Sequence, residues 1–97
     1  MREIDRLAQM LKEAHIPFDL YLDGPTGAQR KHLLYPKFDN HVCSVIQGYN
    51  TYGNEQNLLE IFGLTDTEDD VEGWLSASEV FDRIKAHWGE TPAHVEG

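Results

Sequence analysis

The sequence predicts an α+β fold: an antiparallel sheet of three or four strands, with an N-terminal and a C-terminal amphipathic helix packed on one face. Apolar residues recur at helical spacing near both ends of the chain, and short apolar segments bounded by turn formers lie between them. This order of helix, strands and helix is typical of α+β domains. A chain of 97 residues is long enough for one domain. We place the domain at 1–90 and expect a flexible C-terminal tail at 91–97.

The first predicted helix covers residues 2–15. Ile4, Leu7 and Leu11 fall on one stripe at spacings of three and four. Pro17 ends the helix, because the residue before a proline is pushed out of the helical region.

Short apolar segments then predict strands at 18–22, 31–35, 42–47 and 58–62. In the first of them, Phe18, Leu20 and Leu22 alternate with polar or amphipathic residues, which predicts a half-buried strand. The segment at 58–62 also fits a short helix. The acidic run at 66–72 is predicted to be a surface loop.

The last helix begins with a clear signal. Ser76 and Glu79 have the spacing of a capping box, and apolar residues then share one face as far as Trp88. Gly89 stands where a C-terminal glycine cap is expected. Trp74 is expected to pack on the first turn of the helix.

The charge of the chain is concentrated in its second half. The net charge is −9, and residues 49–97 carry all of it, with eleven acids against two bases. Without clustered Lys or Arg, direct binding to nucleic acid or to an anionic membrane is disfavoured. An acidic surface instead favours a basic partner or high solubility.

Catalytic and metal sites find little support. No histidines are paired at ligand spacing, so no metal or cofactor is expected. As a calcium loop, the run from Asp66 would place Val71 where glycine is needed and Ala77 where the bidentate acid is needed. His41 and Cys43 could face the same way on a strand, but a lone cysteine in a β-rich segment is more typical of a core. The single cysteine suits a reducing cytoplasm. We therefore expect a cytoplasmic protein that is not an enzyme.

Two segments are candidate partner-binding surfaces. The first is the acidic run, whose carboxylates are Asp66, Glu68, Asp69, Asp70 and Glu72. The second is a glycine-flanked turn that carries Tyr49, Asn50 and Tyr52, because exposed tyrosines are good interface anchors.

The second half of the chain contains a series of short motifs: Tyr52-Gly53, Leu58-Leu59-Glu60-Ile61, Gly63-Leu64 and the run from Val71 to Phe81, followed by Arg83-Ile84 and His87-Trp88. Through these motifs, about residues 52–88 resemble small uncharacterised proteins of Firmicute phages and prophages. This resemblance implies a phage protein that acts in a bacterial host. In that setting we expect a non-enzymatic inhibitor of host nucleic-acid-handling machinery, of the anti-CRISPR or DNA-mimic type, which binds a basic host protein or nucleoprotein. The alternative is a small structural or accessory phage protein that acts through a homodimer or another protein interface.

Overall fold

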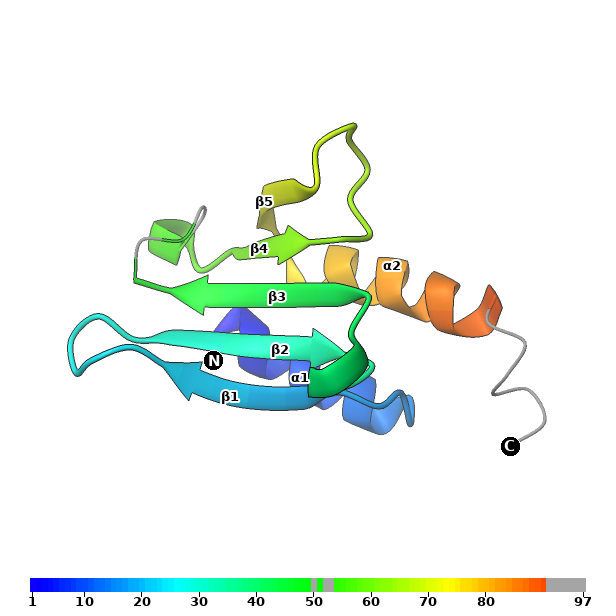
Figure 1. Ribbon diagram of the computed structural model, residues 1–97, viewed down its shortest axis with the longest axis horizontal. Coiled ribbons are helices and arrows are strands. Elements are labelled where there is room, and N and C mark those ends of the chain that lie inside the picture. Colours follow the sequence, from blue (N-terminus) through cyan, green and yellow to red (C-terminus); the bar gives the residue numbers. More distant parts are fainter. Residues whose placement is uncertain (50, 52–53, 91–97) are drawn as a thin grey trace.

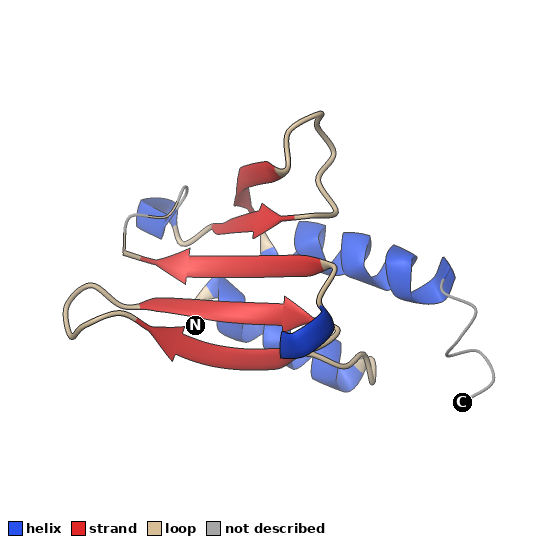
Figure 2. Cartoon of the chain, in the orientation of Figure 1, coloured by secondary structure: helices blue, strands red, loops and turns tan. Residues whose placement is uncertain are grey.

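The computed structural model describes residues 1–49, 51 and 54–90. Over these residues the chain forms a five-stranded antiparallel sheet in the order β1-β2-β3-β4-β5, and both α-helices cover the same face of it (Figures 1 and 2). The helices are α1 (Glu3–Glu13) and α2 (Ala77–Glu90), and the strands are β1 (Asp19–Asp23), β2 (Arg30–Tyr35), β3 (Cys43–Gly48), β4 (Leu59–Phe62) and β5 (Val71–Leu75). Two short 3-10 helices, Phe38–Asn40 and Asn54–Gln56, lie in the connections. The α+β class is confirmed, and the predicted count of three or four strands is wrong.

The strand missing from the prediction is β5. The acidic run was expected to continue as a loop to residue 72, yet Val71 and Glu72 pair with Phe62 and Ile61 of β4. The pairing then shifts register, and Trp74 adopts a left-handed backbone with φ of 57°. The strand was not predicted because Glu72 and Gly73 have low strand propensity and interrupt the apolar pattern. The segment at 58–62 is a strand and not a helix.

The core lies between the sheet and the two helices. Ile4, Leu7 and Leu11 of α1 and Val80 and Ile84 of α2 are completely buried, as the helical spacing predicted. They pack with the strand residues Leu33, Val45, Leu59 and Ile61. Each such side chain contributes about 1.5–3 kcal/mol when fully buried. The edge strand β1 departs from its prediction, because all five of its residues are exposed and only Phe18, just before it, packs on the core.

Distant side chains cap the start of α1. The Ile4 N–H donates to Gln47 Oε1 at 3.0 Å, and the Glu3 N–H donates to Asn57 Oδ1 at 3.1 Å. Gln47 Nε2 in turn donates to Asn57 Oδ1 at 2.8 Å. Since the first amides of a helix have no partner within the helix, these contacts fix where α1 begins on the sheet.

The start of α2 has the predicted capping box. The Glu79 N–H donates to Ser76 Oγ at 3.2 Å, and the Ser76 N–H donates to Glu79 Oε1 at 3.1 Å. Glu3 adds a third contact, because its Oε2 accepts from the Ala77 N–H at 2.6 Å. The expected glycine cap is wrong: α2 continues to Glu90, so Gly89 lies inside its last turn. The predicted tail at 91–97 lies outside the described residues.

Candidate protein-binding surface

The face of the sheet opposite the helices, which we call the open face, is built from three rows of paired residues. One row crosses the strands as Tyr21, His32, Ile46 and Glu60. The next runs as Asp19, Leu34, Ser44, Phe62 and Val71, and the third as Asp23, Arg30 and Gly48. Neighbouring strand residues alternate between faces, so these rows are the counterpart of the core rows that contact the helices.

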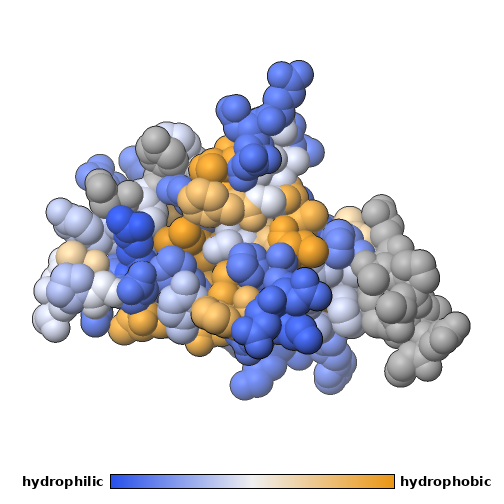
Figure 3. Space-filling model, viewed as in Figure 1, coloured by the Kyte–Doolittle hydropathy of each residue, from blue (hydrophilic) through white to orange (hydrophobic). Residues whose placement is uncertain are grey.

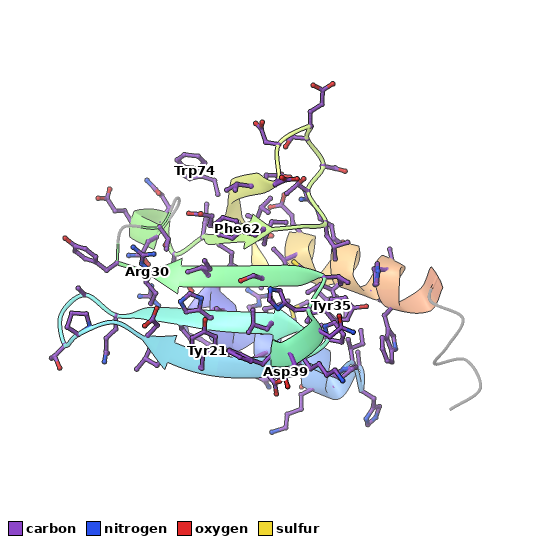
Figure 4. All side chains as sticks on the ribbon, viewed as in Figure 1. Tyr21, Arg30, Tyr35, Asp39, Phe62 and Trp74 are labelled. Carbon is purple, nitrogen blue, oxygen red and sulfur yellow. The ribbon has the colours of Figure 1, made fainter. Side chains whose placement is uncertain are left out.

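The open face is more apolar than a solvated sheet surface. Figure 3 shows hydrophobic side chains gathered across its middle, with hydrophilic ones around them. Leu34 and Ile46 lie there at only 4% and 8% exposure, although α1 and α2 are on the other face; the short 3-10 helix Phe38–Asn40 lies in front of the end of β2. Larger exposed side chains surround this centre: Tyr21, Phe38, Val42, Phe62 and Trp74. Figure 4 shows Tyr21, Phe62 and Trp74 spread over β1, β4 and β5.

Trp74 reaches the surface because of the irregularity in β5. Its left-handed backbone interrupts the alternation of the strand, so Leu75 turns into the core and Trp74 is left 57% exposed. The expectation that Trp74 packs on the first turn of α2 is therefore wrong. Leu75, the residue directly before Ser76, is the apolar residue buried at the helix start.

Aromatic rings stack at the β1 side of the open face. The Tyr21 and His32 rings lie parallel with centroids 4.5 Å apart, and Phe38 meets Tyr21 edge-on at 5.7 Å. Burial lowers the pKa of His32, an effect that nearby Asp23 opposes, with Oδ2 3.7 Å from Nε2. The imidazole is therefore predominantly neutral near pH 7. His32 Nε2 is buried and has no hydrogen-bond partner in the described part of the chain.

The acidic run is divided by the structure into a loop and an anchor. Asp66, Glu68, Asp69 and Asp70 are exposed on the loop between β4 and β5, which projects away from the sheet (Figure 1). Glu72, in contrast, accepts two hydrogen bonds from Arg83 of α2, at 2.7 and 3.0 Å, and one from the Asp66 N–H at 2.8 Å.

Through these contacts Glu72 connects the start of the loop, at Asp66, to Arg83 of α2. The Arg83 hydrogen bonds are the main cause that lowers the pKa of Glu72, and the same pair raises the pKa of Arg83. Asp66 lies 3.8 Å from Arg83 but remains 86% exposed. We call Asp66, Glu68, Asp69 and Asp70 the loop acids. They extend the open face with negative charge beside the strand that carries Trp74.

The tyrosine turn lies elsewhere. Tyr49 is 57% exposed at the end of β3, and its carbonyl accepts from Arg30 Nε at 3.0 Å. The loop acids follow Phe62 at the opposite end of the paired strands, so the structure does not bring the two predicted surfaces together. Asn50 and Tyr52 lie outside the described residues.

His41 and Cys43 do not form a catalytic pair. Cys43 belongs to the core at 1% exposure, and burial raises the pKa of its thiol to about 12. His41 is exposed, and its Nδ1 lies 3.1 Å from the carbonyl oxygen of Phe38. Among the described residues there is no group of three or more His, Cys, Asp or Glu side chains placed to hold a metal ion.

The apolar members of the open face were missed by sequence reasoning. Phe62 follows the buried Ile61, and Leu34 follows the buried Leu33. When both neighbours in a strand are apolar, alternation does not show which of the two faces is covered.

Comparison of the chain with protein-family models, curated proteins and solved structures gave no match. None of the helices in the described ranges is long and apolar enough to cross a membrane.

Proposed function

We propose that this protein is a non-enzymatic binding protein that contacts a basic protein through the open face and the loop acids. The observation that carries the proposal is the uncovered apolar and aromatic sheet surface, with four exposed carboxylates on the loop next to it. Exposed patches of this kind, with polar rims, mark interaction sites. Trp74 and Tyr21 are of the residue types that dominate interface energetics.

The loop acids and the apolar residues have different tasks in this proposal. Clustered carboxylates attract a basic partner over a distance and orient it, which raises the association rate at low salt. Phe62 and Trp74 then lose exposed apolar surface on contact, which slows dissociation. In the phage setting that the resemblance implies, the partner is a host protein whose basic groove binds nucleic acid, and the carboxylates take the place of phosphates.

Matched variants test the electrostatic part. The loop variant carries Glu68→Gln, Asp69→Asn and Asp70→Asn. The control variant carries the same change in charge at three exposed acids away from the open face, as Glu13→Gln, Glu55→Gln and Asp82→Asn. The immobilised proteins are exposed to bacterial lysate at low and high salt, and the retained proteins are identified by mass spectrometry. Double-stranded DNA is added as a competitor.

The expected result is that the wild type and the control variant retain basic nucleic-acid-binding proteins at low salt, and that DNA displaces them. The loop variant should lose them. Equal retention by the two variants, or retention that salt does not weaken, would contradict the proposed role of the loop acids. Trp74→Ala tests the apolar part and should speed dissociation more than association.

The apolar character of the open face also favours a second candidate, self-association through this surface. In this candidate the exposed Tyr21, Phe62 and Trp74 pack against a second copy, as in many homodimer interfaces. Size-exclusion chromatography with light scattering separates the candidates: a dimer that persists at high salt and is broken by Phe62→Ser supports self-association. If the protein is a monomer at all concentrations, the result supports binding of a basic partner protein at the open face.

A further inference from the structure

A hollow of about 350 Å³ lies at the end of the sheet where the β1–β2 turn and the end of β3 extend past the start of α1. Its lining includes a row of paired residues on the helix side of the sheet, Leu22, Lys31 and Gln47. Arg2, Tyr49 and Asn54 close it from the start of the chain and from the segment after β3. None of these six residues belongs to the open face or to the loop acids, although Gly48, which also lines the hollow, stands at the end of the third row of the open face.

The charge of this lining is opposite to that of the chain. The protein has 17 acidic and eight basic residues, yet the ionised side chains that line the hollow in the described part of the chain are Arg2 and Lys31. Lys31 forms an ion pair with Asp5, which lies outside the lining, at 2.5 Å between Nζ and Oδ1. Arg2 forms no ion pair with the described residues, so it supplies the uncompensated positive charge of the wall.

Hydrogen-bond donors also exceed acceptors here. Lys31 donates one of its three N–H groups to Asp5, and Gln47 donates one of its two to Asn57. Arg2 has five N–H groups and donates through Nη2 to Asn54 Oδ1.

Three acceptors of the lining are, in contrast, already engaged. Gln47 Oε1 accepts from Ile4, Asn54 Oδ1 from Arg2, and the Gly48 carbonyl from Thr51. Gln47 is itself only 1% exposed, so a ligand oxygen that met its second N–H would be well shielded from water. A ligand with several acceptor oxygens fits the free N–H groups of Arg2, Lys31 and Gln47.

Gly48, a further residue of the lining, lies against the backbone at the start of β2. Gly48 has φ of 150°, and a Cβ built on it would lie 2.4 Å from the Gln29 carbonyl oxygen. The close approach of β2 and β3 at this point therefore requires glycine. Leu22 and the ring-bearing Tyr49, both more than half exposed, add apolar surface to the polar lining.

We propose that this hollow binds a small organic oxyanion, whose phosphate or carboxylate oxygens meet Arg2, Lys31 and Gln47 and whose apolar part lies along Leu22 and Tyr49. Its volume is at the lower end of the range for small-molecule sites, which limits the ligand to a small metabolite. This inference is independent of the proposed binding of a basic protein, because it uses other residues and a ligand of opposite charge.

The test is an NMR titration of the ¹⁵N-labelled protein with phenyl phosphate, benzoate, inorganic phosphate and phenol as separate probes. Saturable shifts should appear at the backbone amides of Lys31, Gln47 and Gly48 with an anionic aromatic probe and not with phenol. Stronger binding of phenyl phosphate assigns a phosphate ester, and stronger binding of benzoate assigns a carboxylate. Inorganic phosphate should bind more weakly than phenyl phosphate, since it lacks the apolar part.

Variants connect the shifts to the lining. Arg2→Gln and Lys31→Gln should each weaken binding by about tenfold, the loss expected for one charge-assisted hydrogen bond. Arg6→Gln is the matched control, because Arg6 is an exposed base of α1, four residues after Arg2, and lies outside the lining. Thermal unfolding identifies any variant that does not fold. If Lys31→Gln does not fold, the binding affinity of Arg2→Gln tests the proposal alone. The absence of saturable shifts at 10 mM probe, or equal weakening by Arg6→Gln, would overturn the proposal.

Discussion

Replacing Glu72 with glutamine should lower the free energy of unfolding by about 1–2 kcal/mol at pH 7. The change removes one bidentate ion pair with Arg83, whose two hydrogen bonds measure 2.7 and 3.0 Å. Exposed ion pairs contribute about 0.2–1 kcal/mol, and single hydrogen bonds to charged groups about 1.5–3 kcal/mol. Both side chains are 19% exposed, so the Glu72–Arg83 pair lies between these two cases.

The effect of this substitution should depend on pH with a definite sign. The pKa of Glu72 is lowered in the folded protein, chiefly by the hydrogen bonds from Arg83. The folded state therefore binds a proton on Glu72 less tightly than the unfolded state does, and the stabilisation is complete above the ordinary glutamate pKa of about 4.3. It is lost as the pH falls through the lowered pKa. The difference between wild type and Glu72→Gln should shrink from pH 7 to pH 3.

Urea unfolding followed by circular dichroism at both pH values measures this difference. Glu68→Gln is the control, because Glu68 is an exposed loop acid whose side chain makes no hydrogen bond or ion pair with the described residues. Its effect should stay within about 0.5 kcal/mol, as for an ordinary surface change. The reasoning is refuted if Glu72→Gln matches Glu68→Gln at pH 7, or if its effect is the same at pH 3.

Three further results are expected. Gly48→Ala should lower the free energy of unfolding in urea by more than about 1 kcal/mol, because φ is 150° and the new Cβ would lie 2.4 Å from the Gln29 carbonyl oxygen. Gly27→Ala is the control and should cost less, because φ is 89° but the space around the residue is open. Ser76→Ala should cost about 1 kcal/mol by the same assay, since it removes the cap on the Glu79 N–H, and Ser78→Ala on the exposed first turn is its control. Cys43 should not react with a thiol reagent at pH 8 in the folded protein, because burial raises the pKa of its thiol to about 12. It should react fully once urea unfolds the chain, and rapid labelling without urea would contradict this expectation.

Elements whose pattern is strong were predictable from the sequence. The stripes of α1 and α2 and the Ser76–Glu79 capping box each follow from contacts within a few residues, and local contacts leave local patterns. The strand β5 left no such pattern, because its five residues include a glycine and a left-handed Trp74. Its existence depends on pairing with β4, which one sequence does not display.

The candidate site shows the same division. The charge count identified the acidic run, but it could not separate Glu72 from the loop acids, since its partner Arg83 lies eleven positions further along the chain. The apolar open face was not predicted for a related reason. Alternation assigns residues to two faces, and only the placement of both α-helices on the same side shows that Leu34, Ile46 and Phe62 lie on the face away from them.

The role of Glu72 as an anchor also decides how the binding proposal must be tested. The loop leaves β4 and returns as β5, with the Gly63 N–H donating to the Asp70 carbonyl at 3.1 Å and Glu72 joined to both Asp66 and α2. Neutralising Glu72 together with the loop acids would therefore alter the support of the loop as well as its charge. Loss of binding in such a variant would not distinguish electrostatics from a displaced loop. A variant that keeps Glu72 changes only carboxylates at exposed positions, so its binding reports the charge of the surface itself.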